Sequence, residues 1–161
     1  QLQRAMTAMA MSCRPDLIIF DEPTTALDVT TQIEVLAAIR DIVEQFNTAA
    51  IYITHDLAVV AQMADRITVM YGGRIAETGP AEAVFSAPGH PYTRGLLASI
   101  PNIKLDQPEL RTMPGSPPDL VNPPPGCVFH PRCPEVMDRC SRERPGFFDS
   151  DGRRISCWLH A

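Results

Sequence analysis

The sequence predicts an α/β fold with a mainly parallel sheet, followed by a small irregular extension rich in cysteine. Two short apolar runs, residues 17–20 and 49–54, flank a segment of helical periodicity at residues 31–46. Strands that are joined through a helix are typical of parallel pairing. Proline recurs through residues 101–126, which excludes helix there and indicates a linker. Four of the 5 cysteines follow that linker.

The chain is expected to open with a helix over residues 1–14, which Arg14-Pro15 ends. Apolar side chains recur there at helical spacing and should bury one face. These side chains are Leu2, Ala5, Met6, Met9, Ala10 and Cys13. Because Cys13 lies on this face, we expect it to pack in the core rather than to serve as a reactive thiol.

Two adjacent carboxylates follow the first apolar run. Residues 17–20 are apolar at every position, which favours a strand buried in a parallel sheet. Pro23 breaks the pattern, so Asp21 and Glu22 stand at the strand's C-terminal end, where open α/β sheets bind ligands. Asp21 is placed to hold Mg²⁺, and Glu22 to polarise a water against a phosphate. The alternative is two solvated acids in a turn, but the preceding strand and the nearby Asp28 favour the functional interpretation.

A second buried strand is expected over residues 49–54, and His55 follows it as Glu22 follows the first. In neighbouring parallel strands, two such side chains could point at one phosphate. The histidine can stabilise developing charge whether neutral or protonated. Asp56 is expected to cap a short helix over residues 57–64.

The helix between the two strands is expected from about Thr31 to Phe46. Thr31 and Glu34 have the spacing of a capping box. Apolar residues recur along it on one stripe, as in a helix that faces a core. Asp28, just before it, is either a local cap or a functional group.

A hairpin closes this part of the chain. Residues 66–70 and 74–78 are expected to be strands, and Tyr71-Gly72-Gly73 has the chemistry of a tight turn between them. Pro80 is expected at the first position of a short helix that ends at Phe85. Another helix is expected over residues 92–100.

Residues 17–28 resemble the Walker B motif and D-loop of ABC-transporter ATPases, which are P-loop NTPases. Residues 51–56 resemble the next strand and the switch-histidine loop of that family. Residues 1–6 resemble the end of its signature motif and the helix that the motif opens. The three matches come in the family's order and spacing. The chain is therefore expected to be the C-terminal part of a longer ATPase.

The resemblance implies roles for five residues around ATP and Mg²⁺. Glu22 would be the general base toward the lytic water, Asp21 would hold Mg²⁺, and His55 would contact the γ-phosphate. Gln1 would be the last residue of the signature motif, which contacts the nucleotide on the opposite subunit. Asp28 would meet the partner subunit and couple the two ATP sites. No Gly-x-x-x-x-Gly-Lys-Ser/Thr loop occurs, so this chain alone is not expected to bind ATP well.

His90-Pro91-Tyr92-Thr93 resembles the C-terminal extension of oligopeptide and dipeptide importer ATPases, and Met113-Pro114-Gly115 also has a counterpart there. This implies the ATP-binding subunit of a peptide importer. Its partners would be a second ABC ATPase and transmembrane permease subunits, with an extracellular peptide-binding protein involved indirectly. The ATP-binding subunit would lie peripherally on the cytoplasmic face of the inner (plasma) membrane. His90 is expected to be structural.

Four cysteines cluster near the end of the sequence among turn-forming residues: Cys127, Cys133, Cys140 and Cys157. Two disulfides would suit a secreted protein, not a cytoplasmic ATPase. A zinc site is chemically sound, but the usual Cys-x₂₋₄-Cys spacing is absent, and a [4Fe–4S] cluster tolerates wider spacing. His130 and His160 are alternative ligands. The same pattern around Pro-Arg-Cys-Pro in the importer ATPases implies a [4Fe–4S] cluster that holds the extension in place, with zinc as the runner-up.

Three parts are therefore expected: residues 1–86 from the ATPase domain, residues 87–126 with a helix and linker, and residues 127–161 as the four-cysteine extension. The net charge of −5 and the lack of a basic cluster argue against nucleic acid as a partner. No apolar run approaches the ~20 residues that cross a bilayer. The alternatives are a metal-stapled fragment without catalysis and a related importer ATPase for nickel or another small solute.

Overall fold

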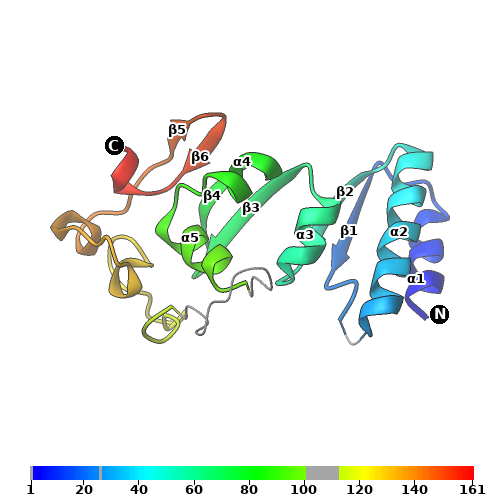
Figure 1. Ribbon diagram of the computed structural model, residues 1–161, viewed down its shortest axis with the longest axis horizontal. Coiled ribbons are helices and arrows are strands. Elements are labelled where there is room, and N and C mark those ends of the chain that lie inside the picture. The colour runs from blue at the N-terminus through cyan, green and yellow to red at the C-terminus, as the bar shows by residue number, and fades with distance from the viewer. Residues whose placement is uncertain (1, 26, 101–112) are drawn as a thin grey trace, which may run out of the picture. The chain divides into compact units, whose positions relative to one another are not determined.

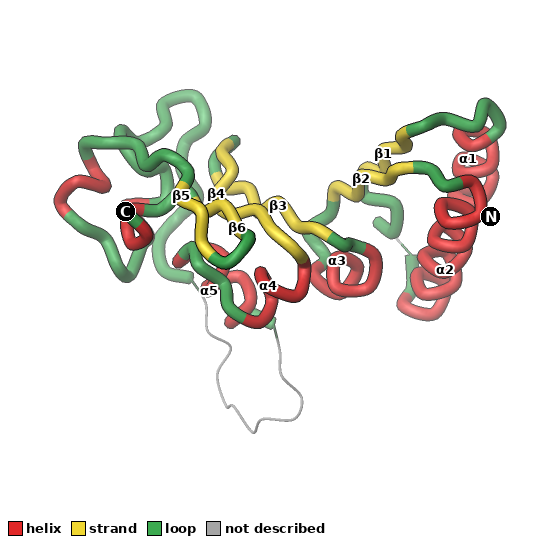
Figure 2. The backbone as a smooth tube through the Cα atoms, turned by 90° about the horizontal axis from the view of Figure 1, so that it is seen from above, coloured by secondary structure: helices red, strands yellow, loops and turns green. Residues whose placement is uncertain are grey.

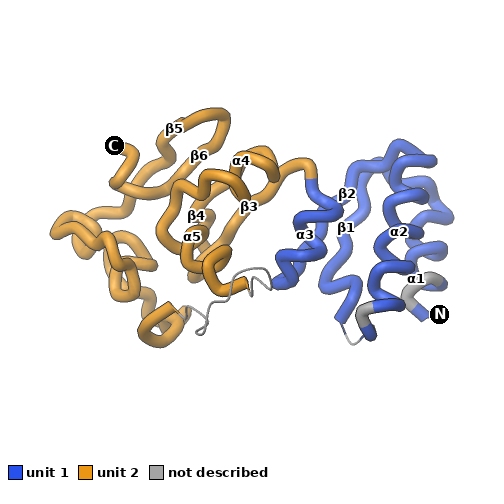
Figure 3. The backbone as a smooth tube through the Cα atoms, viewed as in Figure 1, with its two compact units in different colours: residues 1–64 blue, residues 65–161 orange. Residues whose placement is uncertain are grey.

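The structure is a computed structural model that describes residues 2–25, 27–100 and 113–161 (Figure 1). Gln1 and the first half of the expected linker lie outside the described residues. The chain divides into two compact units, residues 1–64 and residues 65–161 (Figure 3). The expected boundaries near residues 86 and 126 remain predictions.

The first unit alternates helices and strands. Its elements are α1 (Leu2–Met11), β1 (Leu17–Asp21), α2 (Val29–Phe46), β2 (Ala49–Ile53) and α3 (Leu57–Met63) (Figure 1). β1 and β2 pair in parallel, from Leu17 opposite Ala49 to Asp21 opposite Ile53. The prediction of two parallel strands joined through a helix is confirmed.

One face of β1 packs in the core of this unit. Ile18 and Phe20 are buried with Val35 and Ile39 of α2, and the ring of Phe20 stacks on Tyr52 with centroids 5.1 Å apart. The alternate side chains of β1 are exposed within the described structure. The prediction of a strand covered on both faces is therefore wrong for the described residues, because only the face of β1 that carries Ile18 and Phe20 is buried.

α1 buries a different face from the one predicted. Leu2, Met6 and Met9 are exposed, and Cys13 beyond the helix is exposed as well. The side chain that joins the core is Met11. The prediction that Cys13 packs in the core is therefore wrong. The apolar spacing identified the helix but not which of its faces meets α2.

The second unit is built on a four-stranded sheet in the order β3-β4-β6-β5 (Figure 2). These strands are β3 (Arg66–Tyr71), β4 (Arg74–Pro80), β5 (Phe148–Ser150) and β6 (Arg153–Ile155). All three pairings are antiparallel. Within the described residues the sheet content is therefore not mainly parallel, which corrects the prediction. Short hairpin turns impose antiparallel pairing on β3–β4 and on β5–β6.

The cysteine-rich region is not wholly irregular, because it contributes β5 and β6 to this sheet. β6 pairs with β4 through Glu77 opposite Ile155 and Thr78 opposite Arg154. Along the sequence, β4 is followed by the helices α4 (Ala81–Ser86) and α5 (Pro91–Ala98). Two of the three short 3-10 helices that the structure shows in this region come after α5 and before β6. The extension therefore continues the sheet of the preceding hairpin.

Pro80 is the N-cap of α4 rather than its first residue, and α5 ends two residues before its predicted end. Three aromatic rings form a cluster at the core of this unit: Tyr71, Tyr92 and Phe129, with centroids 4.6 to 5.4 Å apart. No helix among the described residues is long and apolar enough to cross a membrane.

Candidate active site

The structure brings Glu22 and His55 together at the C-terminal edge of β1 and β2. His55 Nδ1 lies 2.7 Å from Glu22 Oε1. The backbone N–H of Glu22 donates to the carbonyl of Ile53 at 2.8 Å, so the parallel pairing runs one residue beyond β1. Neighbouring parallel strands present their carboxyl ends at the same edge, and that alignment places the two side chains side by side.

Glu22 holds an unusual backbone conformation. Its φ is +48°, in the left-handed region that non-glycine residues rarely occupy. Thr25 Oγ1 donates to Glu22 Oε2 at 3.1 Å, and the Thr25 N–H donates to the Glu22 carbonyl at 3.2 Å. Such backbone outliers cluster at functional sites. Both oxygens of the carboxylate are therefore engaged, one by Thr25 and one by His55.

The pair has complementary electrostatics. The hydrogen bond from His55 lowers the pKa of Glu22, and the hydrogen bond to Glu22 raises the pKa of His55. The histidine side chain is 82% exposed and the glutamate 36%. Glu22 is thus kept ionised at neutral pH, and its side chain remains partly exposed to solvent.

Asp28 is the N-cap of α2. Its Oδ1 accepts from the Thr31 N–H at 3.0 Å, and its Oδ2 accepts from the Thr31 hydroxyl at 2.7 Å. These bonds lower the pKa of Asp28. The prediction that Thr31 and Glu34 cap this helix is wrong, because Asp28 takes the capping position and α2 begins at Val29. The cap is the local role that sequence left open; contact with a partner subunit stays a prediction.

Asp56 caps α3 as predicted, since its Oδ1 accepts from the Ala58 N–H at 2.8 Å. Its Oδ2 accepts from Gln32 Nε2 at 2.9 Å, and this bond is the main cause of its lowered pKa. The sequence reasoning missed Gln32, because a polar residue on a helix carries no pattern that points to a partner 24 positions away.

Asp21 ends β1, opposite Ile53, and its residue is exposed. A carboxylate oxygen at that edge suits the hard-oxygen chemistry of Mg²⁺, which usually takes one or two carboxylates and fills its shell with water and substrate phosphates. Gln1 lies outside the described residues. The roles of Asp21, Glu22, Asp28 and His55 remain predictions.

The four clustered cysteines lie in one neighbourhood. The Cys127 N–H donates to the Cys140 carbonyl at 2.8 Å. Burial raises the pKa of Cys133 to about 11, and interactions with Cys157, Cys127 and Cys140 add to the rise. The cysteines in the described part of the chain are free thiols. Disulfides between them are therefore not formed in this structure.

These thiols do not form a ready single-ion site. Among the described residues, no group of three or more His, Cys, Asp or Glu side chains is arranged to hold a metal ion. Each alternative ligand has one ring nitrogen near a backbone carbonyl: His130 Nδ1 lies 2.9 Å from the Cys127 carbonyl, and His160 Nε2 lies 3.2 Å from the Gly89 carbonyl. The prediction of a metal-binding extension is thus without structural support beyond the grouping of the thiols.

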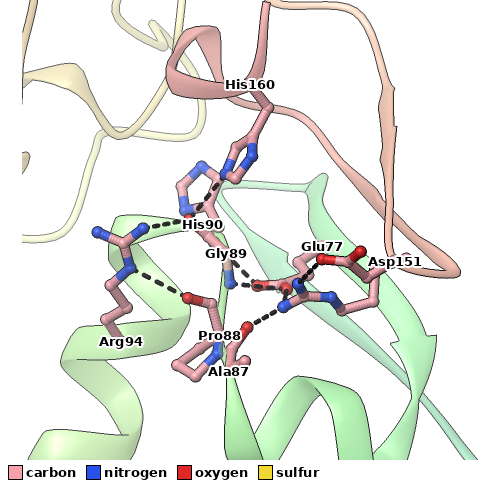
Figure 4. Close-up of polar contacts among 9 residues, drawn as sticks. Glu77, Ala87, Pro88, Gly89, His90, Arg94, Asp151 and His160 are labelled. Carbon is pink, nitrogen blue, oxygen red and sulfur yellow. Dashed lines mark hydrogen bonds and ion pairs between the residues drawn. The ribbon is translucent and has the colours of Figure 1, made fainter.

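A buried acid joins the extension to the turn before α5 (Figure 4). Glu77 of β4 is 0% exposed and accepts from the backbone N–H groups of Gly89 at 2.9 Å and His90 at 3.0 Å. Arg153 of β6 lies 3.4 Å from the same carboxylate and also donates to the Ala87 carbonyl. Three segments far apart in sequence therefore meet at Glu77.

His90 is structural, as predicted. It is the N-cap of α5, and its Nδ1 accepts from the Tyr92 N–H at 3.0 Å. Burial lowers its pKa to about 4. A neutral ring is required here, because only an unprotonated Nδ1 can accept that bond.

Comparison with known proteins finds similarity to transport proteins for oligopeptides and dipeptides. The family model described as "Oligopeptide/dipeptide transporter, C-terminal region" matches residues 76–140. That range runs from β4 through the His90 turn to Cys140 and so includes Glu77, its backbone donors Gly89 and His90, and three of the four clustered cysteines, but not Arg153.

Similarity to curated proteins extends over nearly the whole chain. The chain is 51% identical over 158 residues to the dipeptide transport ATP-binding protein DppD of Bacillus subtilis, and the match covers 98% of this chain and 47% of that protein. It is 49% identical to the oligopeptide transport ATP-binding protein OppD of Salmonella typhimurium, covering 97% and 47%. It is 47% identical to DppD of Escherichia coli, covering 96% and 48%. The chain thus spans about half the length of these relatives.

Proposed function

We propose that the chain belongs with the dipeptide and oligopeptide transport ATP-binding proteins that it resembles, and that the complete protein hydrolyses ATP to drive the import of di- or oligopeptides across the cytoplasmic membrane. This chain contributes the C-terminal part of the ATPase domain and the extension that follows it. The observation that carries the proposal is the pairing of Glu22 with His55 at the shared end of two parallel strands.

In this mechanism Glu22 is the general base. A water aligned on the γ-phosphate gives a proton to the Glu22 carboxylate as its oxygen attacks phosphorus, and the bond to the bridging oxygen of ADP breaks. Thr25 holds Oε2, so Oε1 is the oxygen that takes the proton once His55 turns toward the nucleotide. His55 then donates a hydrogen bond to the γ-phosphate, where charge is redistributed in the transition state.

Asp21 would hold Mg²⁺ at the strand edge, and the ion would neutralise charge on the β- and γ-phosphates. Asp28 would meet a second ATPase subunit, while its cap keeps the start of α2 fixed. Gln1 would complete the signature segment toward the partner's nucleotide. Closure of the two subunits on ATP and opening after hydrolysis would move the permease subunits between their two states.

The partners and location follow from this role. The subunit would pair with a second ABC ATPase, bind transmembrane permease subunits, and lie peripherally on the cytoplasmic face of the membrane. An extracellular peptide-binding protein would act on it only through the permease. The functional division into residues 1–86, 87–126 and 127–161 is proposed on the same grounds.

We further propose that the four clustered cysteines hold a [4Fe–4S] cluster, with zinc as the runner-up. Four free thiols in one neighbourhood supply the donor set that such a cluster needs. Each thiolate of the cluster binds a different iron, so the thiols need not converge on one point as they must around a zinc ion. The bound cluster would hold the extension in place, and the extension would supply four thiolates and a partly buried site for the cluster.

The proposal is tested by reconstituting the complete subunit with its second ATPase and permease in liposomes and measuring ATP hydrolysis and the uptake of a labelled dipeptide. ATP-dependent uptake is expected. Hydrolysis with uptake of nickel but not peptide would favour the related importer. If the protein neither hydrolyses nor binds ATP, the result would favour a metal-stapled module without catalysis.

A further inference from the structure

Gln32 joins the two turns that carry the predicted site residues. Its backbone N–H donates to the Asp28 carbonyl at 2.9 Å. Its side-chain Nε2 donates to Asp56 Oδ2 at 2.9 Å, and that contact is partly buried. A single residue in the first turn of α2 therefore bridges the turn before α2 and the turn before α3.

Asp56 is held in one conformation by this bond and two others. Its Oδ1 accepts from the Ala58 N–H at 2.8 Å, and its own N–H donates to Thr54 Oγ1 at 3.0 Å. His55 is the residue between Thr54 and Asp56, so the backbone is fixed on both sides of it. The imidazole that this backbone carries lies 2.7 Å from Glu22.

We propose that Gln32 is a positioning residue for His55. It ties the loop of His55 to α2, so that the backbone that carries the imidazole keeps its place beside Glu22 when the side chain turns toward the nucleotide. The inference rests on the proposed ATPase function. Gln32 acts through Asp56 and the backbone, so its loss should slow turnover without weakening the binding of ATP.

The chemistry of the contact defines the variants. The amide donates a hydrogen bond to an ionised carboxylate, which is stronger than a bond between neutral groups. Gln32→Met keeps the length of the side chain and removes the donor. Gln32→Lys restores a donor that can reach Asp56. Gln45, exposed near the other end of α2, provides the matched control as Gln45→Met.

The experiment measures kcat and KM for ATP in the complete subunit, assembled with its partner subunits. Gln32→Met is expected to lower kcat about tenfold with KM changed less than about twofold, as the loss of one charge-assisted bond implies. Gln32→Lys is expected to recover most of the rate, and Gln45→Met to match the wild type. If Gln32→Met does not fold, Gln32→Asn shortens the reach of the amide and should show the same loss.

A double-mutant cycle with His55→Ala separates this inference from the function on which it rests. If Gln32 acts through His55, adding Gln32→Met to His55→Ala should cause no further loss. A full additional loss in that background, or an unchanged kcat in Gln32→Met alone, overturns the positioning role while the ATPase assignment stands. Normal turnover in His55→Ala alone overturns the proposed site itself.

Discussion

His55 Nδ1 and Glu22 Oε1 lie 2.7 Å apart although 33 positions separate the two residues in sequence. Each follows one of two parallel strands, and the register that sets Asp21 opposite Ile53 decides that they meet. A shift of that register by one residue would turn the side chains to opposite faces. The strand pairing is therefore part of the site.

The first prediction concerns the pH dependence of this pair. An NMR titration of the chain should give His55 a pKa above its ordinary 6.5 and Glu22 a pKa below its ordinary 4.5. Glu22→Gln should return the pKa of His55 toward 6.5, because the largest cause of its shift is removed. A His55 pKa that is unchanged by Glu22→Gln would contradict the pairing.

The sign of the linked stability follows from these directions. The interaction with Glu22 that raises the pKa of His55 stabilises the fold fully below pH 6.5. This contribution is lost as the pH rises through the pKa of His55 in the folded state. The interaction with His55 that lowers the pKa of Glu22 stabilises the fold fully above pH 4.5. This contribution is lost as the pH falls through the pKa of Glu22 in the folded state. The pair should therefore stabilise the fold most between pH 4.5 and 6.5, and Glu22→Gln should flatten that region of the profile.

The second prediction concerns Glu77, which is fully buried against Arg153 and two backbone donors. Glu77→Leu should lower the free energy of unfolding by about 3–5 kcal/mol, because it leaves the buried N–H groups of Gly89 and His90 without their acceptor and removes one of the two carboxylates that face the Arg153 guanidinium. Urea denaturation measures this loss. Glu82→Leu, at an exposed position of α4, is the control and should change stability by less than about 0.5 kcal/mol. Equal effects at both positions would contradict the role of Glu77.

The third prediction concerns Gly126, whose φ is +68°. A Cβ there would overlap the Cys140 carbonyl oxygen and lie 2.9 Å from the Ser141 carbonyl carbon, which are backbone atoms that cannot give way. Gly126→Ala should therefore destabilise the extension by at least about 1–3 kcal/mol. Gly146→Ala is the matched control, since nothing lies within 4 Å of its Cβ. Thermal unfolding of the two variants makes the comparison.

The fourth prediction concerns the cysteines. Protein purified without oxygen should contain about four irons and four sulfides per chain and absorb broadly near ~400 nm. Cys133→Ser should lose this absorption, whereas Cys13→Ser, an exposed thiol in the other unit, should keep it. A finding of one zinc and no iron per chain would favour the zinc site over the cluster. A finding of neither iron nor zinc would leave both metal proposals without support.

Local patterns predicted much of the first unit. The β-branched run at residues 49–53 and the apolar run at 17–20 became the two parallel strands because such side chains suit a packed sheet. Asp56 caps α3 because its short carboxylate follows a strand and precedes a helix. Asp28 rather than Thr31 caps α2, since both residues are good caps and only the position of the turn decides between them.

Long-range partners could not be predicted from the sequence. Cys13 satisfied the apolar spacing of its helix, yet Met11 is the residue that meets the core. The pairing of β6 with β4 involves a strand, β6, of only three residues, which is too short to show a periodicity. Glu77 looks like an exposed strand residue until Arg153, 76 positions later, is placed beside it. Such contacts are set by the packing of the whole unit.

The most direct test of the central claim is the turnover of Glu22→Gln in the complete subunit assembled with its partners. The amide keeps the shape of the side chain but cannot take a proton from water, so ATP binding should persist while hydrolysis nearly stops, with a loss of about 10²–10⁴-fold. Hydrolysis at or near the wild-type rate in this variant would contradict the assignment of Glu22 as the general base.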